Sequence, residues 1–300
     1  MFKNKEIIYL KALTPVHAGA GQTLENVDMP IQRERHSNIP KIEASTLKGA
    51  IKHSLYNKFK DENGILLDND KNNLYTIFGP EESGEEYASS IGFTDAKLLF
   101  FPIKSATNIF KLITCPYIIS RWMEDLSFQD VIYENEKFRD EIKIDEGMCL
   151  TVSDEKNVVL EDYIFKKYDK KKCEDIISIF KDVPSLDVNR IVILNDSDFI
   201  DLVTMYTEII TRNQINVKTG TAEDTGLFTE EYLPTETILY FIVLASPSFN
   251  EKNILKSEEV LEYFYENVDK VFQVGGNATI GKGFVRRFRR GEKDEQSKKY

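Results

Sequence analysis

The residues best suited to chemistry lie in one long polar segment near the start of the chain. This segment, from Leu13 to Lys52, contains His17, His36 and a single aspartate, Asp28. Its prolines and glycines are typical of loops, where functional residues often lie close to a ligand. His17 can serve as a base or a phosphate contact near neutral pH, or it can simply pack in the loop. Asp28, taken alone, is most simply interpreted as a turn residue.

Two arginines follow Asp28 in the same segment. Arg33 and Arg35 alternate along an expected extended stretch, so their side chains would point to the same side and could clamp a phosphate. The alternative is that they form surface ion pairs with Glu34 or Glu43.

A helix is expected directly after these arginines. Ser45 is placed to cap its start, and apolar residues continue with helical spacing to about Lys60. Lys48 and Lys52 lie one turn apart near the positive end of the helix dipole. Together with free backbone N–H groups, Ser45, Lys48 and Lys52 are predicted to form a phosphate site, although two solvated lysines would give the same pattern.

A second candidate site lies near the end of the chain, in the glycine-rich segment 275–283. Four glycines in nine residues allow the backbone to approach a ligand closely, and the basic run from Lys282 to Arg290 contains no acid. The segment lacks GKS/T and no strand precedes it, so it is neither a Walker A loop nor a dinucleotide loop. The alternative is a glycine turn with a solvated basic tail. The candidate ligand-binding residues are Gly275, Gly276, Asn277, Gly281, Lys282, Gly283 and Arg286.

The composition is that of a globular protein, with 300 residues of which 41% are hydrophobic and 30% charged. This length suits one large domain or two small ones. The net charge of −11 argues against general nucleic-acid binding, although the placement of basic residues matters more than their sum. Three distant cysteines without a CxxC pair indicate neither a disulfide framework nor a zinc site. Without a signal segment or a bilayer-spanning apolar run, we expect a soluble, cytoplasmic protein with no membrane partner.

The strands and helices expected from the sequence must hold these candidate segments in place. The expected strands cover residues 7–13, 97–103, 112–115, 190–194, 235–246 and 284–288. The expected helices cover residues 45–60, 116–125, 173–180, 198–210 and 256–274. The polar ranges 61–90 and 124–190 are predicted to be insertions on this core. Residues 211–225 turn at Gly220 and are predicted to form a projecting hairpin, with part of 150–190 as the alternative.

Five motifs, in this order, resemble one known family. They are LTPVHAGAG (13–21), DMPIQRERH (28–36), PKIEASTLKG (40–49), EEYLP (230–234) and GGNATIGKG (275–283). The set resembles the RAMP superfamily of CRISPR proteins, and DMPIQRERH is similar to the Cmr-module backbone subunit of type III-B effector complexes. The motifs lie at both ends of the chain, whereas residues 104–210 match no motif of that family.

The resemblance implies a single α+β domain over residues 1–300, with a ferredoxin-like (RRM-like) RAMP core, insertions and a projecting β-hairpin thumb. It also implies a subunit that polymerises along CRISPR RNA into a helical filament, together with other Cmr-module subunits. Such a subunit cuts complementary target RNA at regular intervals with a divalent metal. The catalytic loop acid of the family falls on Asp28, while Glu230 and Tyr232 match a motif with a supporting role near the cut.

The implied chemistry asks little of the protein, because RNA carries its own nucleophile in the adjacent 2′-OH. Asp28 beside Mg²⁺ or Mn²⁺ could help to deprotonate this hydroxyl and offset charge on the phosphate. A single carboxylate is a poor metal cage, so the metal would bind weakly and only together with RNA.

Three other functions compete with this one. The chain could be a RAMP scaffold that coats CRISPR RNA without cutting. It could also be a CRISPR-RNA processing endoribonuclease that uses acid–base catalysis through His17 and no metal. The third is an unrelated enzyme that binds a mononucleotide at the glycine-rich segment and ignores long RNA.

Overall fold

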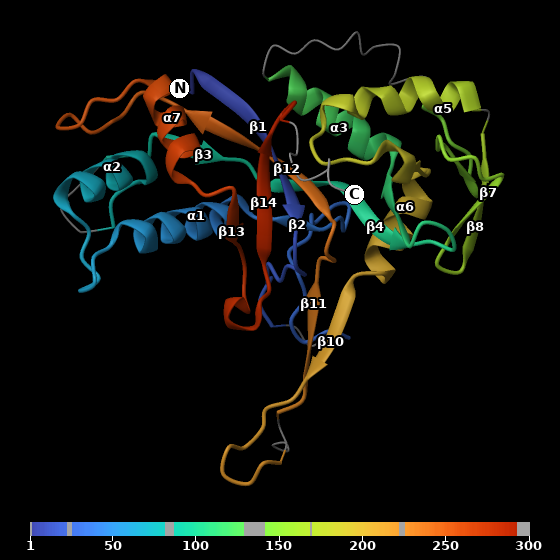
Figure 1. Cartoon of the computed structure of the whole chain (residues 1–300), viewed down its shortest axis with the longest axis horizontal. Helices are drawn as coiled ribbons and strands as arrows, with labels where there is room; N and C mark the ends of the chain where they lie inside the picture. The colour runs from blue at the N-terminus through green and yellow to red at the C-terminus, as the bar shows by residue number, and fades with distance from the viewer. Residues whose placement is uncertain are drawn as a thin grey trace.

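The computed structural model describes most of the chain (Figure 1). The described residues are 2–22, 26–81, 87–128, 142–168, 170–221 and 226–292. Parts of the two predicted insertions, residues 82–86 and 129–141, and residues 222–225 of the predicted hairpin lie outside this set. No helix within the described ranges is long and apolar enough to cross a membrane.

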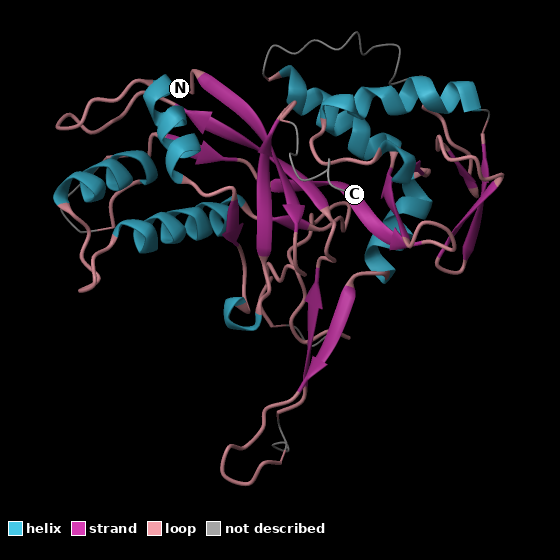
Figure 2. Cartoon of the chain, in the orientation of Figure 1, coloured by secondary structure: helices cyan, strands magenta, loops and turns pink. Residues whose placement is uncertain are grey.

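One mixed sheet forms the centre of the molecule (Figure 2). It contains β1 (Asn4–Ala12), β2 (Lys41–Ile42), β3 (Ile91–Phe93), β4 (Ala96–Lys104), β5 (Phe110–Thr114), β9 (Ile191–Ile193), β12 (Ile238–Ala245), β13 (Val271–Gln273) and β14 (Phe284–Arg289). The main order is β13-β14-β1-β12-β4-β5-β9, while β2 pairs with β4 and β3 with β12. The pairs in this sheet are antiparallel except β5 with β9, which is parallel.

The inner part of this sheet has the β-α-β-β-α-β arrangement of a ferredoxin-like core. Helix α1 (Ala44–Phe59) follows β1, and helix α7 (Ser257–Asn267) follows β12. The spatial order β14-β1-β12-β4 places the first and third strands of the core at its centre. The predicted α+β fold with a ferredoxin-like core is therefore confirmed.

Helix α3 (Pro116–Ser127) covers one face of the central strands. Tyr9 of β1 and Tyr240 of β12 are register partners and therefore point to the same face. The indole N–H of Trp122 donates to the Tyr9 hydroxyl at 3.2 Å, and the Tyr240 hydroxyl donates to Asp125 at 2.8 Å. These buried contacts attach α3 to the middle of the sheet.

The opposite face is covered by α7 and by α2 (Asp68–Phe78). The ring of Phe241 in β12 lies 5.8 Å from that of Phe93 in β3. The Phe93 ring lies in turn 5.9 Å from Phe264 of α7 and 6.2 Å from Phe78 of α2. Because helices cover both faces, the central residues of β1 and β12 are buried, which explains their continuous apolar sequences.

The ranges predicted to be insertions contain secondary structure of their own. Helix α2 lies in the first, and the second holds a small sheet and helix α5 (Lys170–Ile177), which the 3₁₀ turn η1 (Ser178–Asp182) follows directly. The small sheet has the order β6-β8-β7, with β6 (Met148–Cys149), β7 (Asn157–Leu160) and β8 (Tyr163–Lys167). It lies beyond α3 and α6 (Asp196–Met205) at one end of the molecule (Figure 1). A second 3₁₀ turn, η2 (Val188–Arg190), leads into β9.

A two-stranded hairpin projects from the body of the molecule (Figure 1). Strands β10 (Glu208–Arg212) and β11 (Phe228–Tyr232) are antiparallel, and Thr211 lies opposite Thr229. Within the predicted range, residues 211 and 212 end β10 and the described residues 213–221 follow it, so the hairpin begins before that range. Below, "the hairpin" means residues 208–232.

The helix predicted over 256–274 is too long. Helix α7 ends at Asn267, and β13 pairs with β14 so that Phe272 lies opposite Val285. Val268, Val271 and Phe272 would fit a helical stripe, but β-branched and aromatic residues also favour strands. Pairing with β14, which the local sequence does not reveal, decides between the two.

The buried indole of Trp122 provides a test of this packing. We expect Trp122→Ala to lower the free energy of unfolding by about 3–5 kcal/mol, because it leaves a large cavity between α3 and β1. Urea unfolding followed by circular dichroism measures this loss. Tyr117→Ala on the same helix is the matched control, because Tyr117 is 39% exposed and its removal opens no buried cavity. Equal losses for the two variants would contradict the described position of α3.

Candidate nucleic-acid interface and cleavage site

The Asp28 loop (residues 26–33) lies along the base of the hairpin as an additional partner of β11. The Met29 amide donates to the Thr229 carbonyl at 3.0 Å, and the Glu231 amide donates to the Met29 carbonyl at 3.0 Å. The resulting bridge between Met29 and Glu230 is parallel. The loop is therefore fixed to the hairpin by main-chain hydrogen bonds, although 200 residues separate the two in sequence.

The carboxylate of Asp28 is exposed and is held by a single residue of the hairpin. Its Oδ2 accepts hydrogen bonds from the Thr229 amide and the Thr229 hydroxyl, both at 2.8 Å. The Asp28 amide donates back to the Thr229 hydroxyl at 3.0 Å. The hydrogen bond from the Thr229 amide and, second, that from its hydroxyl lower the pKa of Asp28 below its ordinary value. The group is therefore an anion at neutral pH.

Glu231 is a buried carboxylate that anchors the same loop. It accepts hydrogen bonds from the Ile31 amide at 3.0 Å and from the Thr207 hydroxyl at 2.7 Å. It also pairs with the Arg33 guanidinium at 2.5 Å. Arg33 donates further to the Asn38 carbonyl at 2.8 Å, so its charge is used within the protein. The one indication of this role in the sequence is that the EEYLP motif contains a second acid.

Glu230 and Tyr232 belong to a separate buried network at the hairpin base. Glu230 pairs with Arg212 at 2.6 Å and accepts a hydrogen bond from the Tyr232 hydroxyl at 2.6 Å. Arg212 and the Asn277 amide group both donate to the Tyr232 hydroxyl, at 2.6 and 3.0 Å. Asn277 also donates to Glu230 at 3.1 Å. These bonds connect both strands of the hairpin to the glycine-rich segment.

The pKa values of this network keep its charges fixed near neutral pH. Burial raises the pKa of Glu230, but hydrogen bonds from Tyr232 and Asn277 and the charge of Arg212 outweigh it and leave the pKa below its ordinary value. Burial and the neighbouring Glu230 raise the pKa of Tyr232 to about 12. Glu230 is therefore ionised and Tyr232 protonated throughout the physiological range.

His17 is buried against the same part of the hairpin. Its Nδ1 lies 2.7 Å from the Glu231 carbonyl oxygen, which can only accept, so Nδ1 carries a proton and donates. The ring lies 5.5 Å from that of Tyr232. Gly19 is required beside it, because a Cβ there would lie 2.8 Å from Nε2. His17 and Asp28 thus contact neighbouring residues of β11.

The glycine-rich segment packs on the loop that carries His17. Gly275 has a φ of +81°, and a Cβ there would lie 2.2 Å from the His17 carbonyl oxygen. The amides of Gly276 and Gly283 donate to the carbonyls of His17 and Pro15, both at 2.9 Å. These two amides therefore bind protein, and the prediction that they are available to phosphate is wrong. Asn277 and Gly281 are left-handed, and the turn η3 (Ala278–Ile280) lies between them.

The capping role predicted for Ser45 is wrong. Helix α1 begins at Ala44, with Glu43 at the N-cap position. The Ala44 amide donates to Oδ1 of Asp95 at 2.9 Å. An acid of the neighbouring β3–β4 turn thus occupies the helix start, where an incoming anion was expected.

The two lysines of α1 do not form the predicted phosphate site. Lys48 is largely buried and donates to the Ser89 hydroxyl at 2.7 Å, and burial lowers its pKa. Lys52 donates to the Gly79 carbonyl at 2.8 Å and pairs with Glu81 at 2.9 Å. Both ammonium groups are directed to the C-terminal end of α2 and the strand after it. Contact of Ser45, Lys48 and Lys52 with RNA remains a prediction, but these residues do not form a shared phosphate site in this structure.

Most of the basic side chains after Gly283 also form contacts within the protein. Arg287 is buried and donates to the Val268 carbonyl at 2.6 Å. Arg289 stacks 3.3 Å from the Tyr265 ring centre, and Arg290 pairs with Asp182 at 3.0 Å. Arg286 precedes Arg287 in β14, so its side chain points to the other face of the strand, and it is only half-buried. Lys282 lies 5.1 Å from the Tyr232 ring centre.

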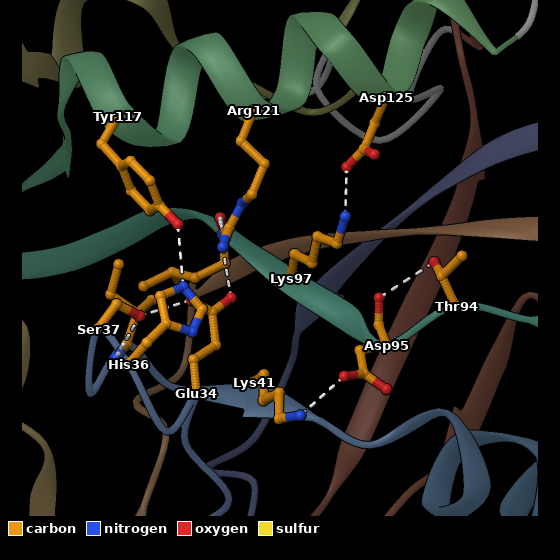
Figure 3. Close-up of polar contacts among 12 residues, drawn as sticks. Glu34, His36, Ser37, Lys41, Thr94, Asp95, Lys97, Tyr117, Arg121 and Asp125 are labelled. Atoms are coloured by element: carbon orange, nitrogen blue, oxygen red, sulfur yellow. Dashed lines mark hydrogen bonds and ion pairs between the residues drawn. The ribbon is translucent and has the colours of Figure 1, made fainter.

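The turn after the Asp28 loop is fixed to α3 (Figure 3). Glu34 is buried, pairs with Arg121 and accepts a hydrogen bond from the Ser37 hydroxyl at 2.5 Å. His36 Nε2 lies 3.1 Å from the Tyr117 hydroxyl. Arg35 lies in this turn and is exposed, so the predicted extended alternation with Arg33 is wrong. The chain between β1 and α1 is thus attached to the hairpin on one side and to α3 on the other.

A metal ion would find few protein ligands here. Among the described residues, no group of three or more His, Cys, Asp or Glu side chains could hold one. Asp28 offers Oδ1, which makes no hydrogen bond within the described part of the chain. One carboxylate oxygen fits a cation only if other oxygen ligands come from bound RNA and water.

Comparison with known proteins identifies the family of this chain. The sequence model of the RAMP superfamily matches residues 9–286. The chain belongs to the RAMP superfamily. This RAMP protein is 35% identical over 291 residues to the CRISPR system Cmr endoribonuclease Cmr4 of Pyrococcus furiosus, with 93% of this chain and 94% of that one covered. It is 25% identical over 308 residues to the CRISPR system CMR subunit Cmr4 of Saccharolobus solfataricus, with 92% and 94% covered.

Solved structures share the fold of this RAMP protein. A chain in the cryo-EM structure of the type III-B Cmr-beta complex bound to cognate target RNA has a TM-score of 0.74 at 23% identity, over 95% of this chain and 97% of that one. Oligomeric Cmr4 from Pyrococcus furiosus has a TM-score of 0.68 at 26% identity, over 95% and 97%. The first structure is similar in fold alone, whereas the second is similar in both fold and sequence.

The Glu231–Arg33 pair provides a test of how the Asp28 loop is held. We expect Glu231→Gln to lower the free energy of unfolding by about 3 kcal/mol, because it leaves the Arg33 guanidinium, only 15% exposed, without its counter-ion. Glu236→Gln is the matched control, since its pair with Lys11 is more exposed and its loss should cost less than about 1 kcal/mol. Urea unfolding measures both. A small loss for Glu231→Gln would show that the loop is held in another way.

Proposed function

We propose that this chain is the backbone subunit of a type III-B CRISPR RNA-guided complex and that it cuts target RNA through Asp28. It would bind CRISPR RNA, assemble with further copies of itself and with other Cmr-module subunits, and cut complementary target RNA at regular intervals. The observation that carries the proposal is an exposed, ionised carboxylate fixed to the base of a projecting hairpin. A subunit repeated along a guide would present this carboxylate once per hairpin.

The relatives support an activity of this kind. The Pyrococcus furiosus relative is named an endoribonuclease, and a structural neighbour is part of a complex bound to target RNA. Oligomeric Cmr4 from the same organism has a similar fold, which supports assembly of several copies.

The residues of the site suit cleavage by the adjacent 2′-OH of RNA. We assign Asp28 the removal of the hydroxyl proton, since its carboxylate is ionised and exposed. The 2′-oxygen would bond to phosphorus as the bond to the 5′-oxygen breaks, and the departing 5′-oxygen would take up a proton from water or from His17, whose Nε2 is the ring nitrogen not bonded to the Glu231 carbonyl. Mg²⁺ or Mn²⁺, when bound by Asp28 together with RNA oxygens, would supply positive charge at the phosphate.

We assign Glu230 and Tyr232 a supporting role that does not include proton transfer. Both are buried and bonded to Arg212 and Asn277, so neither is available to take a proton from RNA. They would hold the hairpin base against the glycine-rich segment. They would therefore support the cut, whereas we assign the proton transfers to Asp28 and His17.

Three basic side chains near the Asp28 loop and the glycine-rich segment are candidates for RNA binding. Arg35 is exposed, and Lys282 and Arg286 are half-buried on the side of the glycine-rich segment. We propose these three as phosphate contacts, with Gly275, Gly276, Asn277, Gly281 and Gly283 shaping the backbone beside them. Arg33 would act indirectly through Glu231.

Cleavage by the assembled complex tests the role of Asp28. With a guide RNA and a labelled complementary target, we expect Asp28→Asn to reduce every regularly spaced cut by about a hundredfold or more, because the base is lost. Addition of EDTA should abolish the cuts of the unchanged complex, while target binding stays the same in both cases.

Asp61→Asn is the matched control for this experiment. Asp61 is also an exposed loop aspartate whose pKa is lowered by backbone hydrogen bonds, chiefly from Ile65, but it lies outside all five motifs. Its substitution should leave the cuts unchanged. Cuts that persist in Asp28→Asn would make this chain a scaffold, and cuts that resist EDTA would favour metal-independent chemistry through His17.

A further inference from the structure

We infer that Thr229 is a positioning residue for RNA cleavage, because its hydroxyl fixes the orientation of the Asp28 carboxylate on the hairpin. This inference rests on the proposed role of Asp28. It assigns a function to a residue outside the EEYLP motif, which begins one position later.

Thr229 contacts Asp28 through two different groups. Its amide and its hydroxyl both donate to Oδ2, and its hydroxyl also accepts the Asp28 amide proton. A hydroxyl has one proton and two lone pairs, so it can donate and accept in this way at the same time. The result is a closed ring of hydrogen bonds that fixes both the backbone and the side chain of Asp28.

This contact determines which oxygen of Asp28 meets the RNA. Both donors of Thr229 bind Oδ2, and Oδ1 has no hydrogen bond among the described residues. An exposed aspartate would otherwise rotate freely and lose orientation at the moment of proton transfer. Thr229 therefore presents Oδ1 in one direction.

The contact also couples the cleavage residue to the hairpin. The Thr229 carbonyl accepts from the Met29 amide, so Asp28 and Met29 are both bound by the same residue of β11. Thr229 lies opposite Thr211 in the ladder of the hairpin. Wherever the hairpin enters a guide–target duplex, the carboxylate must follow it.

Two substitutions separate the hydroxyl from the backbone at this position. Thr229→Val keeps the β-branched shape and the amide but removes the hydroxyl, and Thr229→Ser keeps the hydroxyl. In assembled complexes we expect Thr229→Val to lower the single-turnover rate constant at saturating complex about tenfold. The complex concentration that half-saturates the target, and the affinity for target RNA, should not change. Thr229→Ser should restore the rate to within about twofold of the unchanged complex.

The outcomes distinguish this inference from the proposed function. If Asp28→Asn abolishes cutting while Thr229→Val cuts at the normal rate, Asp28 is catalytic but Thr229 does not position it. If Thr229→Val and Thr229→Ser both lose target affinity or assembly, Thr229 has a structural role and the inference is overturned. If Asp28→Asn cuts normally, both the proposed function and this inference fail. A rate loss confined to Thr229→Val, with binding unchanged, supports the inference.

Discussion

The arrangement of the site depends on one buried carboxylate, that of Glu231. It takes hydrogen bonds from Ile31 and Thr207 and an ion pair from Arg33, so the loop before α1 and the segment before β10 meet on one group. Burying such a charge without partners would be costly, and this cost forces the loop into place. Thr229 lies two residues before Glu231 in β11, on the same side of the strand, and bonds Asp28. The hairpin and the candidate cleavage residue consequently form one structural unit.

The fold was largely predictable because its central strands are covered on both faces and therefore have continuous apolar sequences. The strands expected over 7–13 and 235–246 correspond to β1 and β12, and Pro116 does begin a helix. The failure over 256–274 has a physical cause, since the side chains of β13 satisfy helical spacing and strand pairing equally well. Only the pairing of β13 with β14 decides between helix and strand.

The site was predictable only where a motif marked it. The motif containing Asp28 marked the loop that lies against the hairpin, but the partners of the basic residues did not follow from the sequence. Arg33 meets an acid 198 residues away, and Lys48 meets a hydroxyl 41 residues away. Such pairs depend on the tertiary fold, which a local pattern of charges does not encode. In a chain of net charge −11, Arg33, Lys48 and Arg287 all form bonds within the protein.

Hydrogen exchange of single amides tests most directly whether the Asp28 loop and the hairpin form one unit. The Met29 and Ile31 amides donate to the Thr229 carbonyl and the Glu231 carboxylate, and the Leu233 amide donates to Val16. If the account is correct, the Met29 and Ile31 amides exchange as slowly as that of Leu233, and all three become faster together as urea is added. Exchange of Met29 and Ile31 at the rate of an unprotected peptide, with Leu233 still slow, would contradict it.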